Sequence, residues 1–437
     1  MPTPKITLVA LGSTGDCMPM LALAQGLRQA GYQPTVVTHE AFTGLVESYG
    51  VKVAPLAGDY RVFFRSQEGQ RFLRGEFLPW EPVPQFAKNL PRQLEQVLAA
   101  AQGSQAIIAG PLALWSYHVA EALNLPLIVA ASLPIVETGL FPFLGFGDIP
   151  TSVNPVQSAL NWASYRLVGV LGWVRDRPIL ETFRERHQLP ALPPLGPRYR
   201  AHHPKQLQQV PILHLYSEAV IPRPADWAQS SHPVHVTGYC FPRASQPYTP
   251  SPDLQNFLAQ PQGEGSTPTI ALGFGSMAVA DEQAMLQLLL EAVDRANVSA
   301  VLLAGWGLTQ TGQLTDLVYA TPSMPHDWLF PQVSAVVHHS GSGTVAAGLR
   351  AGLPAVTVPF FGDQPAWANR LTQLGVAPPP IPIQNLTAHN LAAAIKQVLS
   401  SPTMAAKAIA LGETIRAEDG VNCAVSIIQA FVDSVGW

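Results

Sequence analysis

The chain has 437 residues, a formal net charge of −4 and 47% hydrophobic residues, which predicts two or more globular domains and gives no reason to expect a nucleic-acid partner. Its 3 cysteines include no CxxC pair, which excludes a disulfide framework and a zinc box. No segment reaches the ~18 uninterrupted apolar residues of a membrane span, and the first residues are typical of a β-strand rather than of a signal peptide, so a cytoplasmic location is expected.

The first half of the chain alternates apolar runs with helical patterns. A strand over residues 6–11 is followed by a glycine-containing turn, a helix over 18–30 and a strand over 34–38, which together form a βαβ unit. Further strands are expected at 106–110, 126–131 and 211–216. This alternation predicts a doubly wound parallel sheet, and we assign it to a domain of residues 1–240.

The turn after the first strand consists of Gly12, Ser13, Thr14, Gly15 and Asp16. A dinucleotide fingerprint has glycine at its first, third and sixth positions, and Thr14 stands where the second glycine belongs, so a nicotinamide cofactor is not expected. For Asp16 the residues alone support two interpretations equally. It is either an acid that stabilises the helix N-terminus or, at the mouth of a cleft, a general base that accepts a proton from an attacking hydroxyl.

Two stretches of the first half have an unusual composition. Segment 60–92 interleaves basic and aromatic side chains, which is typical of a half-buried insertion, of a lid over an acceptor or of a peripheral contact with an anionic membrane surface. Between Glu121 and Arg166 charges are few, and the prolines there exclude one long spanning helix. This apolar stretch either lines a pocket for a lipophilic acceptor or belongs to the core.

The second half begins another α/β series. Residues 238–254 and 260–268 are loops, and we place the domain boundary between them, which gives a second domain of residues 253–417. Its strands and helices are expected at 270–275, 281–295, 300–305, 333–338, 355–360 and 387–400. A last helix within residues 418–437 has apolar residues at helical spacing and is expected to cross back onto the first domain. Two facing α/β domains enclose a cleft, where ligand sites are common.

The turn after the strand at 333–338 carries the strongest functional signal. It consists of His339, Ser340, Gly341, Ser342, Gly343 and Thr344, and a helical pattern follows it. Such a turn points several backbone N–H groups at one place where the helix dipole also favours negative charge, so it predicts a diphosphate site. His339 is expected to contact phosphate, whereas His338 belongs to the strand. Gly275 and Ser276 are expected to approach the phosphates from the neighbouring strand.

An acid and an amide, Asp363 and Gln364, follow the strand that begins at 355. The C-terminal end of a parallel strand is where open α/β sheets bind ligands, and both side chains can hydrogen-bond sugar hydroxyls. A diphosphate site next to a polyol site predicts a nucleotide sugar. His326, in the loop before the phosphate strand, is a candidate for contact with the base. The histidine pairs at 202–203 and at 232 and 235 lack a cysteine or an acid at ligand spacing, so no metal is expected.

These motifs resemble those of family 1 glycosyltransferases of the GT-B fold, in which two facing Rossmann-like domains enclose the active site. The resemblance is to the bacterial and fungal sterol 3-β-glucosyltransferase-like branch, which also includes glycosyltransferases of antibiotic biosynthesis. It spans nearly the whole chain and is strongest at residues 12–32, 273–277, 325–354 and 359–378.

The resemblance implies an inverting, metal-independent transfer of a hexose, with glucose favoured, from a UDP-sugar to an acceptor hydroxyl, without a cofactor. It implies that the donor diphosphate binds at His339, Gly341, Ser342, Gly343, Thr344, Gly275 and Ser276. It also implies that Asp363 and Gln364 hold the sugar and that Ser323, Met324 and His326 meet the uracil. Asp16 would be the general base, beside the loop of Gly12, Ser13, Thr14 and Gly15. The turn departs from the family's usual HHGGAGT-type sequence at Ser340 and Ser342, which would shift the phosphate geometry slightly.

The acceptor is the least defined part of this prediction. The apolar middle of the chain favours a lipophilic alcohol such as a sterol, a carotenoid or another lipid. Two alternatives stay open: a transferase for a soluble aglycone such as a polyketide or a peptide, and a non-catalytic protein that binds nucleotide sugars or lipids.

Overall fold

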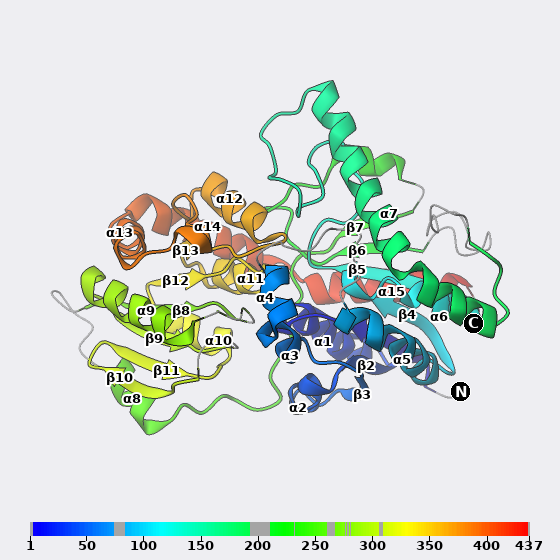
Figure 1. The fold of residues 1–437 in the computed structure, drawn as a ribbon, viewed down its shortest axis with the longest axis horizontal. Helices are drawn as coiled ribbons and strands as arrows, with labels where there is room; N and C mark the ends of the chain where they lie inside the picture. Colours follow the sequence, from blue (N-terminus) through cyan, green and yellow to red (C-terminus); the bar gives the residue numbers. More distant parts are fainter. Residues whose placement is uncertain are drawn as a thin grey trace.

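The computed structural model describes residues 3–73, 84–192, 210–230, 232–259, 267–275, 277, 279, 281–305 and 309–435. In these residues the chain forms two α/β units, each built on its own mainly parallel sheet, with helices packed between and around them (Figure 1). This confirms the predicted fold class of two doubly wound domains.

The first sheet has seven strands in the order β3-β2-β1-β4-β5-β6-β7, and every pair of neighbours is parallel. The strands are β1 (Lys5–Ala10), β2 (Gln33–His39), β3 (Lys52–Leu56), β4 (Ser104–Ala109), β5 (Leu127–Ala131), β6 (Ile212–His214) and β7 (Val234–Val236). The helices of this unit are α1 (Thr14–Gln29), α2 (Thr43–Ser48), α3 (Tyr60–Arg65), α4 (Gln67–Leu73), α5 (Pro84–Ala100), α6 (Ser116–Ala122) and α7 (Pro155–Arg186). The central strands are buried on both faces, as their apolar runs predicted.

The second sheet has six strands in the order β10-β11-β9-β8-β12-β13. They are β8 (Thr269–Gly273), β9 (Ser299–Leu303), β10 (Gly312–Thr315), β11 (Val318–Thr321), β12 (Ala335–His338) and β13 (Ala355–Thr357). The helices that follow the first unit's sheet along the chain are α8 (Pro252–Leu258), α9 (Glu282–Ala296), α10 (His326–Leu329), α11 (Ser342–Ala351), α12 (Gln364–Leu374), α13 (Ala388–Leu399), α14 (Pro402–Ala417) and α15 (Gly420–Val435). The pair β10 and β11 is antiparallel and had no counterpart among the expected strands.

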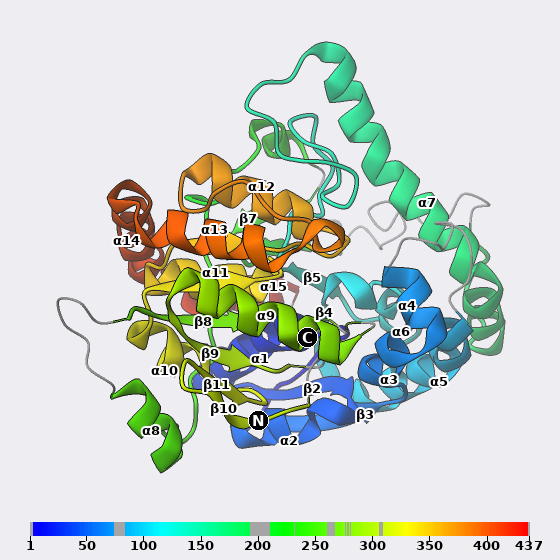
Figure 2. The same cartoon turned by 60° about the vertical axis from the view of Figure 1, so that its left-hand side comes forward.

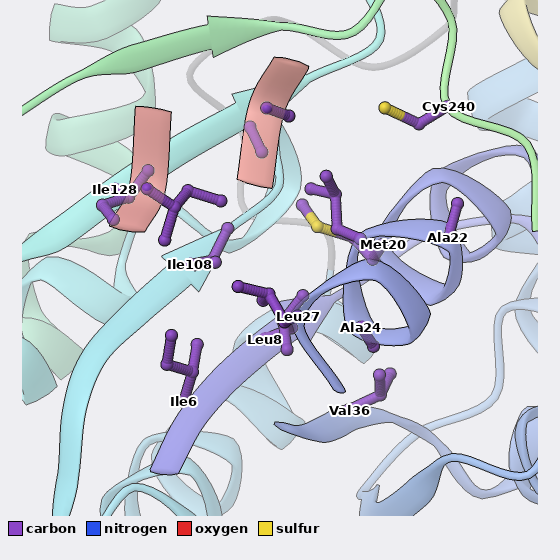
Figure 3. Close-up of a cluster of buried hydrophobic side chains, with 14 of the residues drawn as sticks. Ile6, Leu8, Met20, Ala22, Ala24, Leu27, Val36, Ile108, Ile128 and Cys240 are labelled. Carbon is purple, nitrogen blue, oxygen red and sulfur yellow. The ribbon is translucent and has the colours of Figure 1, made fainter. Parts of the chain in front are cut away.

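The last helix of the chain, α15, packs on the first unit. Ala424, Ile428 and Val432 of this helix lie in the same buried cluster as residues of β1 and α1. Figure 3 shows the centre of that cluster, where Leu8 and Ile108 of neighbouring strands point toward Leu27 of α1. The end of the chain thus contributes to the core of the domain in which the chain begins.

The two units also share a core. The loop after β5 places Phe141, Leu144 and Ile149 in one buried cluster with Leu349 of α11 and Trp367 of α12. Asn369 Nδ2 donates to Asp148 Oδ1 at 2.8 Å, and Gln373 Nε2 donates to the Ile149 carbonyl at 2.8 Å. Much of the apolar stretch between Glu121 and Arg166 is therefore core between the domains.

Candidate active site

The N-termini of two helices meet between the domains, each at the end of a glycine-rich turn. α1 starts after β1 and α11 starts after β12, so both begin at the carboxyl edge of a parallel sheet. A Cβ atom on Gly343 would lie only 3.1 Å from Gly15 Cα, so the two turns approach at backbone distance. Ser342 Oγ donates to Ser132 Oγ of the first unit at 3.2 Å. The positive ends of two helix dipoles converge there, which favours an anion between the domains.

Asp16 sits in the first of these turns as part of a capping box. Its Oδ2 accepts from Ser13 N at 2.8 Å and from Ser13 Oγ at 2.9 Å. No hydrogen bond to Oδ1 is found in the described part of the chain, so one carboxylate oxygen stays available. Gly12, with φ of +122°, is required because a Cβ at this position would lie 2.3 Å from Asp16 Oδ2.

The pKa of the Asp16 carboxyl is raised from 3.8 to about 6, mainly because the group is buried. The hydrogen bonds from Ser13 oppose this shift, and the nearby charge of Asp363 adds to it. Asp16 is therefore ionised near neutral pH but accepts a proton more readily than an ordinary aspartate. Capping and proton acceptance use different oxygens, so the two interpretations of this residue are compatible.

His339 begins the second turn and is held between two glycines. A Cβ atom on Gly341 would lie 2.4 Å from His339 Nε2, and a Cβ atom on Gly275 would lie 2.9 Å from His339 Cε1. Its Nδ1 is buried without a hydrogen-bond partner in the described residues. Burial lowers the pKa of His339 to about 4, with a further contribution from His326, so the ring is neutral. A neutral ring with a buried unpartnered nitrogen suits a ligand oxygen.

His338 differs from its neighbour. It lies in β12, and its Nδ1 accepts from Ser340 N at 3.0 Å. Burial lowers the pKa of His338 to about 3. This bond holds Ser340 at its positive φ of 65°, which shapes the start of the turn.

The acid and the amide after β13 have separate roles in the structure. Asp363 Oδ2 accepts from Trp367 Nε1 at 2.9 Å, and burial raises the pKa of this carboxyl. Gln364 is buried, its Oε1 accepts from Phe360 N at 2.8 Å, and its Nε2 lies 3.3 Å from Met277 Sδ. The Gln364 carbonyl thus holds the loop in place, and its Nε2 donates to Met277 Sδ.

The residues expected to meet the base lie on one loop but differ in exposure. The His326 ring stacks on Phe330 with centroids 4.5 Å apart, and burial lowers its pKa to about 4. Ser323 is exposed, whereas Met324 is buried in a core cluster with Leu329. His326 begins α10, which contacts α11, so this loop lies beside the turn that carries His339.

Three of the predicted positions or segments lie partly or wholly outside the described residues. Ser276 is one of them, as are residues 74–83 of segment 60–92 and the pair at 202–203. In the described part of that segment Phe63 and Phe64 are buried, and the Phe64 ring lies 6.1 Å from Phe361, in the loop that carries Asp363. Helix α3 of the first unit thus reaches the loop after β13 of the second.

Sequence reasoning missed three contributors to this site. Ser132 follows β5 and bonds across the cleft, and Phe361 meets Phe64, neither of which any motif indicates. Leu112, after β4, is exposed beside Gly12. Its position after the carboxyl end of β4 is the sequence signal that could have indicated a place near the ligand site.

Comparisons with known proteins agree with this geometry. Residues 6–142 match the glycosyltransferase family 28 N-terminal domain, and residues 288–429 match the erythromycin biosynthesis protein CIII-like C-terminal domain. The solved structure of TcCGT1 in complex with UDP covers 99% of this chain and 100% of that chain with a TM-score of 0.68 at 13% identity. The protein is a glycosyltransferase of the GT-B fold.

Curated relatives define the family more closely. Sterol 3-beta-glucosyltransferase UGT80B1 of Arabidopsis thaliana is 33% identical over 97% of this chain and 68% of its own length. Sterol 3-beta-glucosyltransferase of Yarrowia lipolytica is 31% identical over 98% of this chain, which spans only 29% of that protein. The chain belongs to the sterol 3-beta-glucosyltransferase family, as the sequence motifs predicted.

Among the described residues, no helix is long and apolar enough to cross a membrane. Nor do they contain a group of three or more His, Cys, Asp or Glu side chains that could hold a metal ion.

Proposed function

We propose that this protein moves glucose from UDP-glucose to the hydroxyl of a sterol-like or other lipid alcohol, in one inverting step that needs no metal. The observation that carries the proposal is the meeting of the turns at Asp16 and at His339. One supplies a carboxylate with an unused oxygen, and the other supplies unpaired hydrogen-bonding groups at a helix N-terminus.

The proposed step is a direct displacement. The acceptor hydroxyl gives its proton to Asp16 Oδ1 while its oxygen forms a bond to the anomeric carbon. The bond from that carbon to the diphosphate oxygen breaks on the opposite face, and the electron pair leaves with UDP. The N–H groups at the start of α11 and the ring of His339 stabilise the developing negative charge in place of a divalent cation.

Three observations support a lipophilic acceptor. The curated relatives are named for a sterol acceptor. Leu112 exposes an aliphatic side chain next to the turn that carries Asp16. Helix α3 places Phe64 next to Phe361, in the loop that carries Asp363. This contact favours the interpretation of this part of segment 60–92 as a lid over the acceptor. UDP as the nucleotide is supported by the structural relative solved with UDP.

The test is release of UDP from UDP-glucose by the purified protein in EDTA, with lipophilic alcohols presented in detergent. We expect release that depends on one class of alcohol and forms the β-glucoside. If UDP binds but none of the alcohols stimulates its release, the donor site is supported and the acceptor class is refuted. Release that requires added Mg²⁺ would refute the metal-independent step, and an α-glucoside would refute inversion.

A further inference from the structure

We propose that residues 155–175 of α7 are a docking surface for an anionic lipid bilayer. Four aliphatic side chains of this helix are exposed to solvent: Val156 (70%), Leu160 (64%), Leu167 (48%) and Val174 (52%). We call these four residues the α7 stripe. Single exposed apolar side chains are ordinary, but a regular row of them marks an interaction surface.

The spacing of the α7 stripe puts it on one face of the helix. Its members follow one another at intervals of four, seven and seven residues. At about 3.6 residues per turn these intervals bring all four side chains within roughly 40° of one another. The result is a narrow ridge that runs along about 27 Å of helix.

The remainder of α7 explains why this ridge points away from the protein. Asn161, Tyr165 and Trp173 are buried, and they lie on the face opposite the stripe. Asn161 Nδ2 donates to the Gly139 carbonyl at 2.9 Å, so the loop after β5 covers that opposite face. At the far end of the helix, buried Arg184 pairs with Glu121 at 2.6 Å. Figures 1 and 2 show that the C-terminal end of α7 packs beside α5 and α6, whereas its N-terminal end projects from the rest of the molecule.

The charges along residues 155–175 of α7 favour a negatively charged partner. The whole chain has a net charge of −4, but residues 155–175 contain no acidic side chain, and their charged residues are Arg166 and Arg175. Arg175 pairs with Asp176 at 2.7 Å, which leaves Arg166 as the basic group beside the stripe. The exposed Arg166 and the lack of acidic side chains in residues 155–175 favour an anionic surface as the partner of the apolar ridge.

The shape of the surface favours a bilayer over a second copy of the chain. A single row of four aliphatic side chains exposes on the order of a few hundred Å². Each partner of a stable protein complex buries about 800 Å² over a complementary patch. A bilayer needs no such complementarity, since a ridge can enter between the headgroups. This inference rests on the proposed function in one respect, because a lipid acceptor would be presented by the same bilayer.

The test is flotation of the protein with vesicles of phosphatidylcholine, alone or mixed with phosphatidylglycerol, without sterol or donor. We expect binding to the mixed vesicles, and a loss of about tenfold or more in Leu160→Glu and Leu167→Glu. Ile409→Glu is the matched control, because Ile409 on α14 is similarly exposed (52%) and the charge change is equal. Arg166→Gln should weaken binding to the mixed vesicles only.

The outcomes separate the docking surface from the donor site. Stabilisation by UDP, measured as a rise in Tm, should be unchanged in all four variants and shows that each is folded. Absence of vesicle binding by the wild type, or equal binding by Leu167→Glu, would overturn the proposal. Concentration-dependent dimerisation that Leu167→Glu abolishes, without vesicle binding, would assign the surface to a second copy. Failure of transfer with intact vesicle binding would refute the proposed function alone.

Discussion

The two turns that meet between the domains, residues 12–16 and 339–344, use a helix N-terminus in opposite ways. In the first, Ser13 and Asp16 form a capping box, so side chains satisfy the backbone at the start of α1. In the second, the N-cap is Gly341, and α11 begins without a side-chain cap. Orphan N–H groups at a helix start need an acceptor, so the second turn is complete only with an outside oxygen.

This difference separates two tasks, the placement of a carboxylate and the binding of a diphosphate, that one turn could not perform together. A carboxylate placed at the start of α11 would fill the anion position and repel a diphosphate. A diphosphate at the start of α1 would compete with Asp16 for the same N–H groups. Because the proposed base and the proposed anion site lie on different domains, each keeps its own electrostatic environment, and the contact between Gly15 and Gly343 brings them together.

The largest effect is expected when the capped turn loses its base. Asp16→Asn keeps an oxygen that can accept from Ser13, so the helix start survives, but an amide cannot take a proton. We expect kcat to fall about 10²- to 10⁴-fold with unchanged affinity for UDP. Asp281→Asn, at the N-cap of α9, makes the same chemical change away from the site and should leave turnover intact. Turnover of Asp16→Asn near that of the wild type would exclude Asp16 as the base.

The second effect concerns the uncapped turn. His339→Ala removes the ring whose Nδ1 lacks a partner, and we expect UDP to bind about tenfold more weakly by calorimetry. The matched control is His232→Ala, which removes another buried ring, one that bonds the Val210 carbonyl. That variant should lower Tm without changing the affinity of the folded protein for UDP. Equal affinities of His339→Ala and the wild type would remove His339 from the site.

These two turns were also the part of the molecule most open to prediction from sequence. Each turn joins an apolar strand to a helix within a few residues, so glycine content and position along the strand were sufficient to locate it. The predicted helix began at residue 18, whereas α1 begins at Thr14 because Ser13 caps it. The alternation of strands and helices is likewise local, which is why the fold class followed from it.

What depends on distant contacts could not be predicted. Gln364 was expected to hold sugar, but its carbonyl accepts from Phe360 N, a bond that exists only once the loop is folded. The contact of Phe64 with Phe361 joins residues of different domains. Helix α7 was not predicted. Its first residues belong to the apolar stretch that was expected either to line a pocket or to lie in the core, but they form a projecting helix with an exposed ridge.

A smaller effect is expected when the two turns are forced apart. In Gly343→Ala the added Cβ would lie 3.1 Å from Gly15 Cα, so the domains must separate by a few tenths of an ångström. We expect kcat to fall about tenfold, while alanine within α11 keeps or raises stability by about 0.5–1 kcal/mol. Gly348→Ala, in the same helix but facing open space, should gain stability without losing turnover. Equal kcat values in the two variants would show that the close approach has no part in transfer.

The smallest effect, a shift on the pH axis, tests how the turns influence each other. Asp16 acts as its carboxylate, so kcat/KM should be constant above its pKa of about 6 and fall tenfold per unit of pH below it. The charge of Asp363 raises the pKa of Asp16 across the domain boundary. In Asp363→Asn the fall of kcat/KM at acid pH (the acid limb) should therefore begin at a lower pH, although the maximal kcat/KM of this variant is also reduced. Asp281→Asn, which removes an acidic charge at the N-cap of α9 away from the site, should leave the pH dependence unchanged. An acid limb that does not move in Asp363→Asn would mean that the base titrates independently of the donor domain, and the two turns would then be joined by contact alone.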